Sequence, residues 1–123
     1  MQAPILVVDD DSSVRGFVRR VLEDCGYQVA LALHAYEALD ILSQLNGAVR
    51  LVLTDVRMPG LSGVELLQRV RSSWPGLPCL CMTGYAEEHG ALAGLVPPCP
   101  LLRKPFSVLE LETAVSGLLS AAP

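Results

Sequence analysis

The sequence lacks the long apolar run that a membrane span requires. Hydrophobic residues make up 51% of its 123 positions, yet no stretch approaches ~18–20 uninterrupted apolar residues. The basic leading segment of a secretory signal is also absent, because the residues from Met1 to Asp11 turn acidic after a short apolar run. We therefore expect a cytoplasmic domain that makes no membrane contact of its own.

Positive charge is scarce as well. Nine Lys and Arg stand against thirteen Asp and Glu, and the formal net charge is −4. Without a basic stripe, direct binding of DNA or RNA is not expected. The length of the chain fits one domain, residues 1–123, built around a single hydrophobic core.

The four cysteines follow no spacing typical of a metal site or a redox motif. Cys79 and Cys81 alternate along an apparent strand, so their side chains share one face. We interpret Cys25, Cys79, Cys81 and Cys99 as small apolar residues in a reducing compartment, rather than as disulfide partners or metal ligands.

Two hydrophobic patterns alternate along the chain. Short continuous apolar runs typical of buried strands are followed by segments in which apolar residues recur at helical spacing. The expected strands are residues 5–8, 28–32, 51–54, 79–83 and 101–103. Five helices are expected. The first begins at a capping Ser12 or Ser13, and the second spans residues 35–45. The third follows Ser62, the fourth lies between Glu87 and Val96, and the fifth follows Ser107. Gly26 and Asn46-Gly47 are expected to end the first two helices.

Strands that alternate with helices of this length imply a parallel sheet covered on both faces. Five such units suit a doubly wound, flavodoxin-like α/β fold with strand order 2-1-3-4-5 and five flanking helices. Glycines at positions 90 and 94 fall within the expected fourth helix, and each costs about 1 kcal/mol relative to Ala in a helix interior. We expect that helix to be short and mobile.

Acidic residues follow two strands that should be neighbours in this sheet. Asp9, Asp10 and Asp11 come directly after the first strand, and Asp55 follows the third. In open parallel sheets, ligands bind beyond the carboxyl ends of the strands, where the strand order switches. Carboxylates gathered there repel one another unless a cation lies among them. Hard oxygen ligands without His or Cys favour Mg²⁺ or Mn²⁺ over zinc.

Two further polar groups should reach the same edge. The fourth strand ends at Thr83, and the fifth leads to Lys104. A hydroxyl and an ammonium can hold the oxygens of a phosphoryl group to which a metal ion also binds. Together with the carboxylates, they provide the positioning and charge neutralisation that phosphoryl transfer requires.

Four stretches of the sequence resemble the receiver domains of two-component response regulators. They are residues 8–11, 54–60, 82–85 and 102–106, and their order and spacing cover essentially the whole chain. The resemblance implies that Asp55 accepts a phosphoryl group from the phosphohistidine of a histidine kinase or a histidine phosphotransfer domain. Such a domain is a phosphoacceptor rather than an enzyme, although a longer parent protein could be a histidine kinase.

The same resemblance implies a role for each residue of the set. Thr83 and Lys104 would contact the phosphoryl group, with the Lys104–Pro105 bond in the cis form. The implied metal ligands are Asp10 and Asp55 directly, Asp9 through a water molecule, and the backbone carbonyl of Arg57.

One position departs from the receiver pattern. Receivers usually carry Tyr or Phe three residues before the lysine, and here that position is Leu101. The aromatic ring to which Thr83 is usually coupled is therefore missing, and the consequence of Leu101 at this position stays open. We hypothesise that Tyr85 takes over part of that role.

Several alternatives remain open at this point. Asp9 and Asp11 also form the Asp-x-Asp signature of haloacid dehalogenase phosphatases, but only Glu110 and Glu112 follow the lysine, both in a helix. Asp11 alone is better explained as a helix cap. Within the receiver interpretation, the chain is either a stand-alone regulator or part of a hybrid sensor kinase. The residues around Thr83 and Lys104 favour the hybrid kinase. Its oligomeric state, a homodimer included, stays open.

Overall fold

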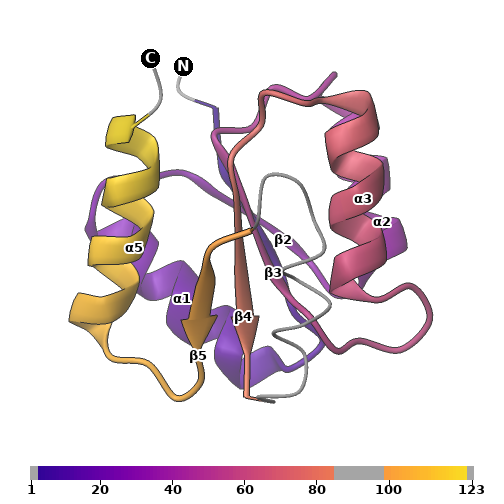
Figure 1. Cartoon of the computed structure of the whole chain (residues 1–123). Helices are drawn as coiled ribbons and strands as arrows, with labels where there is room; N and C mark the ends of the chain where they lie inside the picture. Colours follow the sequence, from indigo (N-terminus) through magenta and orange to yellow (C-terminus); the bar gives the residue numbers. More distant parts are fainter. Residues whose placement is uncertain (1–2, 85–98, 122–123) are drawn as a thin grey trace.

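The computed structural model describes residues 3–84 and 99–121. Within these ranges the chain forms five strands and four helices (Figure 1). The strands are β1 (Ile5–Val8), β2 (Val29–Ala32), β3 (Leu51–Asp55), β4 (Cys79–Thr83) and β5 (Leu101–Arg103). The helices are α1 (Ser12–Asp24), α2 (Ala35–Gln44), α3 (Gly63–Ser73) and α5 (Val108–Ala121). The helix expected between Glu87 and Val96 lies outside the described residues, as does Tyr85.

All five strands are parallel and lie in the order β2-β1-β3-β4-β5. This order confirms the doubly wound, flavodoxin-like sheet expected from the sequence. The chain runs outward from β1 in both directions, so the carboxyl ends of β1 and β3 lie next to each other at the switch point. Val8 of β1 is opposite Thr54 of β3 in the register, which brings the residues after them to one edge.

Helices cover both faces of the sheet (Figure 1). Side chains alternate along each strand, so Leu6 and Val8 pack on the face that α2 and α3 cover, whereas Ile5 and Val7 pack on the face that α1 and α5 cover. Because both faces are buried, the strands read as nearly continuous apolar runs.

The first helix starts differently from the expectation. Ser12 and Ser13 do not cap α1 but form its first residues. The cap is Asp11, whose extended backbone leaves β1 and whose carboxylate accepts hydrogen bonds from the N–H groups of Ser13 (2.8 Å) and Val14 (3.4 Å). A carboxylate also suits the positive end of the helix dipole. The expectation that Asp11 caps this helix is therefore confirmed.

The start of α3 is held against the end of β3. Ser62 and Glu65 form a capping box, in which each side chain accepts a hydrogen bond from the other residue's N–H group. Gly63 follows this cap and lies so close to β3 that an added Cβ would meet the Asp55 carbonyl oxygen and come within 2.8 Å of the Val56 Cα. Only glycine allows this approach, which fixes the loop beside Asp55.

The helix ends follow the expected glycine chemistry. Gly26 has φ of 91°, and Gly47, after α2, has φ of 73°. Both lie in the left-handed region that glycine adopts without steric cost. The second strand starts and the second helix ends within one residue of the expected positions.

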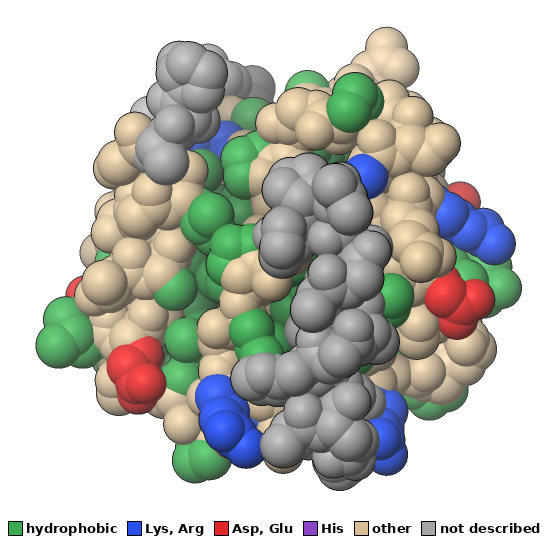
Figure 2. All heavy atoms as spheres, in the orientation of Figure 1, with side chains coloured by type: hydrophobic (Ala, Val, Ile, Leu, Met, Phe, Trp, Pro, Cys, Tyr) green, Lys and Arg blue, Asp and Glu red, His purple; other side chains and the backbone are tan. Residues whose placement is uncertain are grey.

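The described surface carries no large basic area on the face drawn in Figure 2. Its Lys and Arg side chains stand apart from one another, and hydrophobic side chains gather beside α5 instead. Among the helices of the described ranges, none has the length and apolar character needed to cross a bilayer.

Candidate functional site

Buried polar side chains gather at the carboxyl edge of the sheet. Among the described residues, the buried polar or charged side chains are those of Asp9, Thr54, Asp55 and Thr83. Each lies at or just after the end of β1, β3 or β4. Burial of a polar group opposes folding unless the group finds partners. Their concentration at one edge therefore marks this edge as the candidate site.

Three carboxylates at this edge can share one cation. Asp9, Asp10 and Asp55 each offer an oxygen atom, and these atoms lie within 4.8 Å of one another. Asp9 is fully buried, Asp55 is 8% exposed and Asp10 is exposed. Oxygen-only donors, with one ligand open to solvent for retained water molecules, fit Mg²⁺ or Mn²⁺. The expected meeting of these side chains is therefore found in the structure.

Lys104 lies directly among the buried carboxylates. Its Nζ atom is 3.0 Å from Oδ2 of Asp9 and 3.3 Å from Oδ1 of Asp55. The backbone N–H of Lys104 donates to the Thr83 carbonyl at 2.8 Å, and this bond ties the start of the loop to β4. The Lys104–Pro105 peptide bond is cis, as expected. One ammonium does not balance three carboxylates, so the site retains negative charge for a further cation.

The acidic surroundings change how readily Asp55 ionises. Burial raises the pKa of the Asp55 carboxyl to about 6, and the charge of Asp9 adds to this increase. Lys104 acts in the opposite direction through its charge and hydrogen bond. For Lys104 itself, burial lowers the pKa, but the hydrogen bond to Asp9 and the charges of Asp55 and Asp9 outweigh it and raise the pKa. A divalent cation would favour the ionised carboxylate in the same way.

Asp9 is held in place by four hydrogen bonds, one of which its own N–H donates to the Ala32 carbonyl at 3.2 Å. Its Oδ1 accepts from the Asp11 N–H at 2.9 Å, and its Oδ2 accepts from Lys104. Its carbonyl accepts from the guanidinium of Arg15 at 2.7 Å. Because both carboxylate oxygens already have protein partners, an ion is more easily reached from Asp9 through a water molecule. Sequence reasoning missed Arg15, whose one signal is its place one helical turn beyond the capping Asp11.

The carboxylates line an open cleft of about 760 Å³. A hydrated ion together with a phosphoryl group is far smaller than this volume. The described residues that line the cleft are Asp9, Asp10, Asp11, Asp55, Arg57, Met58, Pro59, Gly84 and Lys104.

Of two further expected site residues, Arg57 lines the cleft, whereas Thr83 is not among the described residues that line it. Arg57 is exposed and forms part of the wall, where its backbone carbonyl is expected to serve the metal. Thr83 is 1% exposed at the end of β4, and its neighbour Gly84 reaches the wall. Leu101 is half-buried and packs against the core on the α2 and α3 face, where it replaces the expected aromatic ring.

The acidic residues that a phosphatase site would need have other partners in the structure. Asp11 caps α1 with its carboxylate. Glu110 exchanges hydrogen bonds with Ser107 at the start of α5, and Glu112 accepts one from the thiol of Cys25. The acidic residues that follow Lys104 thus serve the helix and do not complete a metal site.

Comparison with known proteins gives a consistent result. A family profile described as the response regulator receiver domain matches residues 5–116. The chain is 38% identical over 120 residues to the sensor kinase CckA of Brucella abortus, and 40% identical over 120 residues to the response regulator MprA of a Mycobacterium species. These matches cover 95% and 97% of the chain but only 12% and 51% of the two relatives. The chain thus spans at most about half the length of these relatives.

Solved structures agree with the sequence matches. The crystal structure of a response regulator receiver protein from Sinorhizobium medicae has a TM-score of 0.88 and 29% sequence identity to the chain. The match covers 99% of this chain and 98% of the other.

Proposed function

This chain belongs to the family of response regulator receiver domains, and we propose that it accepts a phosphoryl group on Asp55 from a phosphohistidine. The donor would be a histidine kinase or a histidine phosphotransfer domain. The observation that carries the proposal is the position of the Asp55 carboxylate, which faces an open cleft between two other carboxylates and the Lys104 ammonium. As a phosphoacceptor, the domain assists its own phosphorylation without being an enzyme in the ordinary sense.

The chemistry assigned to Asp55 is an in-line displacement. A carboxylate oxygen of Asp55 bonds to phosphorus while the bond from phosphorus to the histidine nitrogen breaks. Lys104, now 3.3 Å from Asp55, would move onto the incoming phosphoryl oxygens, where it neutralises charge. The Thr83 hydroxyl would hold another of these oxygens. The protein therefore contributes positioning and electrostatics, which are the main requirements of phosphoryl transfer.

The proposed metal is Mg²⁺, with Mn²⁺ as a close substitute. When bound, it would neutralise the phosphoryl oxygens. Asp10 and Asp55 would hold it directly, and Asp9 would do so through a water molecule, which agrees with the two protein partners of the Asp9 carboxylate. The Arg57 backbone carbonyl would be the remaining protein ligand.

The parent protein and its setting are also proposals. We assign residues 1–123 to one receiver domain of a cytoplasmic signalling protein, and the family profile covers 5–116 of these. Similarity to a sensor kinase supports a receiver that belongs to a hybrid kinase. The equally strong similarity to a response regulator supports a regulator with its own partner kinase.

Intact-mass measurement tests the proposed acceptor. The protein is incubated with Mg²⁺ and either acetyl phosphate or phosphoramidate, whose phosphorus–nitrogen bond resembles that of phosphohistidine. The expected result is a gain of one phosphoryl mass, which EDTA and Asp55→Asn both abolish.

Asp11→Asn is the matched control, because Asp11 lines the same cleft and Asn is an equally good helix cap. This variant should still gain the phosphoryl group. Uptake of one phosphoryl group by folded Asp55→Asn would contradict the assignment, as would a folded wild-type protein that neither donor modifies.

A further inference from the structure

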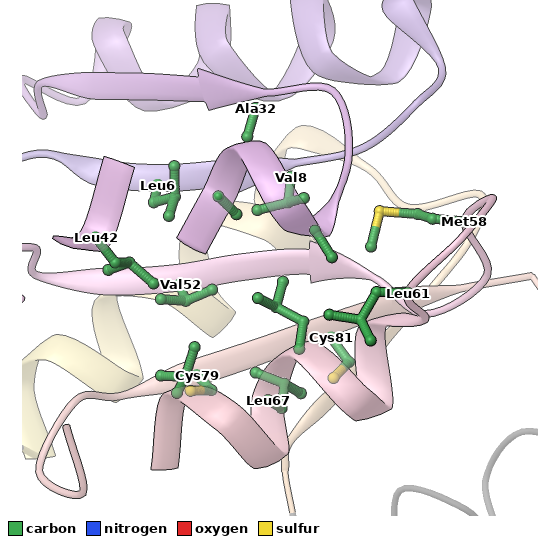
Figure 3. Close-up of a cluster of buried hydrophobic side chains, with 14 of the residues drawn as sticks. Leu6, Val8, Ala32, Leu42, Val52, Met58, Leu61, Leu67, Cys79 and Cys81 are labelled. Carbon is green, nitrogen blue, oxygen red and sulfur yellow. The ribbon is translucent and has the colours of Figure 1, made fainter. Parts of the chain in front are cut away.

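A second set of reactive side chains lies apart from the acidic cleft. Cys79, Cys81 and Cys99 are all buried in the core on the α2 and α3 face of the sheet. Figure 3 shows Cys79 and Cys81 on one side of β4, together with Leu67 of α3. The Sγ atoms of Cys81 and Cys99 lie only 3.1 Å apart. Two thiols in direct contact can be joined by oxidation.

The backbone holds these two cysteines side by side. The N–H of Cys81 donates to the Pro100 carbonyl at 3.0 Å, and Cys81 is opposite Leu101 in the register of β4 and β5. Cys99 therefore stands beside β4 at the point where the chain enters β5. A disulfide needs the sulfurs about 2 Å apart, so the two sulfurs would have to approach each other by about 1 Å.

The contact also distinguishes the two thiols chemically. The hydrogen bond with Cys81 lowers the pKa of the Cys99 thiol despite its burial, and the positive charge of Arg71 lowers it further. For Cys81, the hydrogen bond with Cys99 and burial both raise the pKa. Cys99 is 7% exposed, whereas Cys81 is fully buried. Of the two, Cys99 is thus the thiol that ionises more readily and is more accessible to a small oxidant.

We propose that Cys81 and Cys99 form a reversible intramolecular disulfide when the protein meets a peroxide. The Cys99 thiolate attacks a peroxide oxygen, the O–O bond breaks, and Cys99 becomes a sulfenic acid with release of one water. The Cys81 sulfur then attacks the Cys99 sulfur, the S–O bond breaks, and a second water leaves. Two thiols thereby lose two protons and two electrons, and one hydrogen peroxide is reduced to two waters.

The other cysteines fit this chemistry less well. The Cys79 thiol donates to the Leu77 carbonyl at 3.5 Å, whereas the Cys81 sulfur is in direct contact with that of Cys99. Nor do the three sulfurs make a metal site. Within residues 3–84 and 99–121, the single group of three or more potential metal ligands within 4.8 Å of one another consists of the three aspartates of the cleft. The buried sulfurs therefore act as a pair.

The disulfide would connect two segments that lead to the cleft. Cys81 is two residues before the end of β4 at Thr83, and Cys99 precedes β5, which leads to Lys104. The cross-link would close the chain between residues 81 and 99 into a ring. Its formation does not depend on the phosphorylation of Asp55, so the two proposals can fail separately.

Mass spectrometry of the full chain tests the disulfide. The exposed Cys25 is first replaced, as Cys25→Ser, so that oxidation of this surface thiol does not contribute to the mass change. Folded protein treated with one equivalent of hydrogen peroxide should lose about 2 Da, and dithiothreitol should restore the mass. Cleavage after Arg and Glu separates Cys81 from Cys99, because Glu87 and Glu88 lie between them. In the oxidised protein the two peptides should stay joined until reduction.

Three variants in this background identify the pair. Cys79→Ala is the matched control, since it changes a buried cysteine on the same face of β4 and should retain the cross-link. Cys81→Ala and Cys99→Ala should both lose it. Where a variant fails to fold, fragmentation of the joined peptides between Cys79 and Cys81 assigns the bond in the parent protein. An absent mass change in the folded protein, or a bond to Cys79, would overturn the proposal.

Discussion

The interior of the sheet and its carboxyl edge belong to the same strands but follow opposite rules. In β3, Leu51, Val52 and Leu53 are buried among apolar neighbours, whereas the next two residues, Thr54 and Asp55, are polar and also buried. The interior supplies the free energy of folding through burial of apolar surface. The edge gathers like charges that oppose folding, so it depends on the interior to hold them together.

This difference separates stability from chemistry within a few residues. Substitutions at the edge should change phosphoryl or metal chemistry with little loss of stability. Substitutions in the interior should do the reverse, because the reacting groups remain in place while the protein stays folded.

The largest effect is expected from Asp55→Asn. Loss of the nucleophilic carboxylate should abolish phosphoryl uptake entirely. The free energy of unfolding without metal should not fall, because the variant removes a buried negative charge next to Asp9. Denaturant unfolding in EDTA measures this. A marked loss of stability would mean that the carboxyl edge contributes to the stability of the fold, contrary to the contrast drawn between edge and interior.

Leu53→Ala should affect the opposite property. Leu53 is fully buried one position before Thr54, and its truncation should lower the free energy of unfolding by about 2–5 kcal/mol. Below its melting temperature the variant should still gain one phosphoryl mass from phosphoramidate. Urea unfolding and intact mass, measured on the same sample, check both statements. Loss of uptake in a folded variant would show that the interior also shapes the site.

Gly63→Ala examines the boundary between the two regions. An added methyl group would meet the backbone at Asp55, and the resulting displacement should cost about 1–3 kcal/mol. Gly16→Ala is the control, since Gly16 lies in α1 with nothing within 4 Å of an added Cβ. Alanine there should stabilise the protein by up to about 1 kcal/mol. Equal effects at both sites, measured by thermal unfolding, would rule out the close packing against Asp55.

Asp11→Ala should have a smaller effect. Loss of the carboxylate that accepts from Ser13 and Val14 should cost about 1 kcal/mol of stability, whereas Asp11→Asn should cost less. Both variants should keep phosphoryl uptake. Urea unfolding compares the two, and an equal loss in both would argue against the capping role.

A dependence of stability on pH is also expected. The pKa of Asp55 is raised from 3.8 to about 6 in the folded protein, so its stabilising contribution is complete below the unfolded value and is lost as pH rises through about 6. In EDTA the melting temperature of the wild-type protein should therefore fall as pH rises through about 6. The melting temperature of Asp55→Asn should not show this fall. Added Mg²⁺ binds the ionised carboxylates, so the stabilisation that it gives should grow over the same range. A Mg²⁺ effect independent of pH would contradict this account.

Most of the fold could be predicted because each segment carries its own pattern. Buried strands such as Ile5–Val8 read as apolar runs, and Gly26 marks a helix end by its backbone freedom. The candidate site could be predicted because parallel strands bring Asp9 and Asp55 to one edge whatever the details of packing. Local pattern and topology therefore determine these features together.

What the sequence could not predict depends on contacts between distant segments. The sequence offered Asp11 as well as Ser12 and Ser13 as caps of α1, and the placement of the chain decides for Asp11. The contact of Cys81 with Cys99 depends on the register between β4 and β5. The bond from Arg15 to the Asp9 carbonyl requires the helix to be placed first. For Arg15, the spacing from Asp11 gives only its place on the helix, and the contact of Cys81 with Cys99 has no signal in residue spacing.

The ammonium between Asp9 and Asp55 has a consequence for which ions can act on this protein. Lys104 is covalently tethered, so it competes for the two carboxylates at a high local concentration. Sodium or potassium carries the same single charge and gains little by replacing it. A doubly charged ion adds attraction without displacing the lysine from the cleft. The resting site should thus discriminate by ionic charge and ignore the abundant monovalent salts.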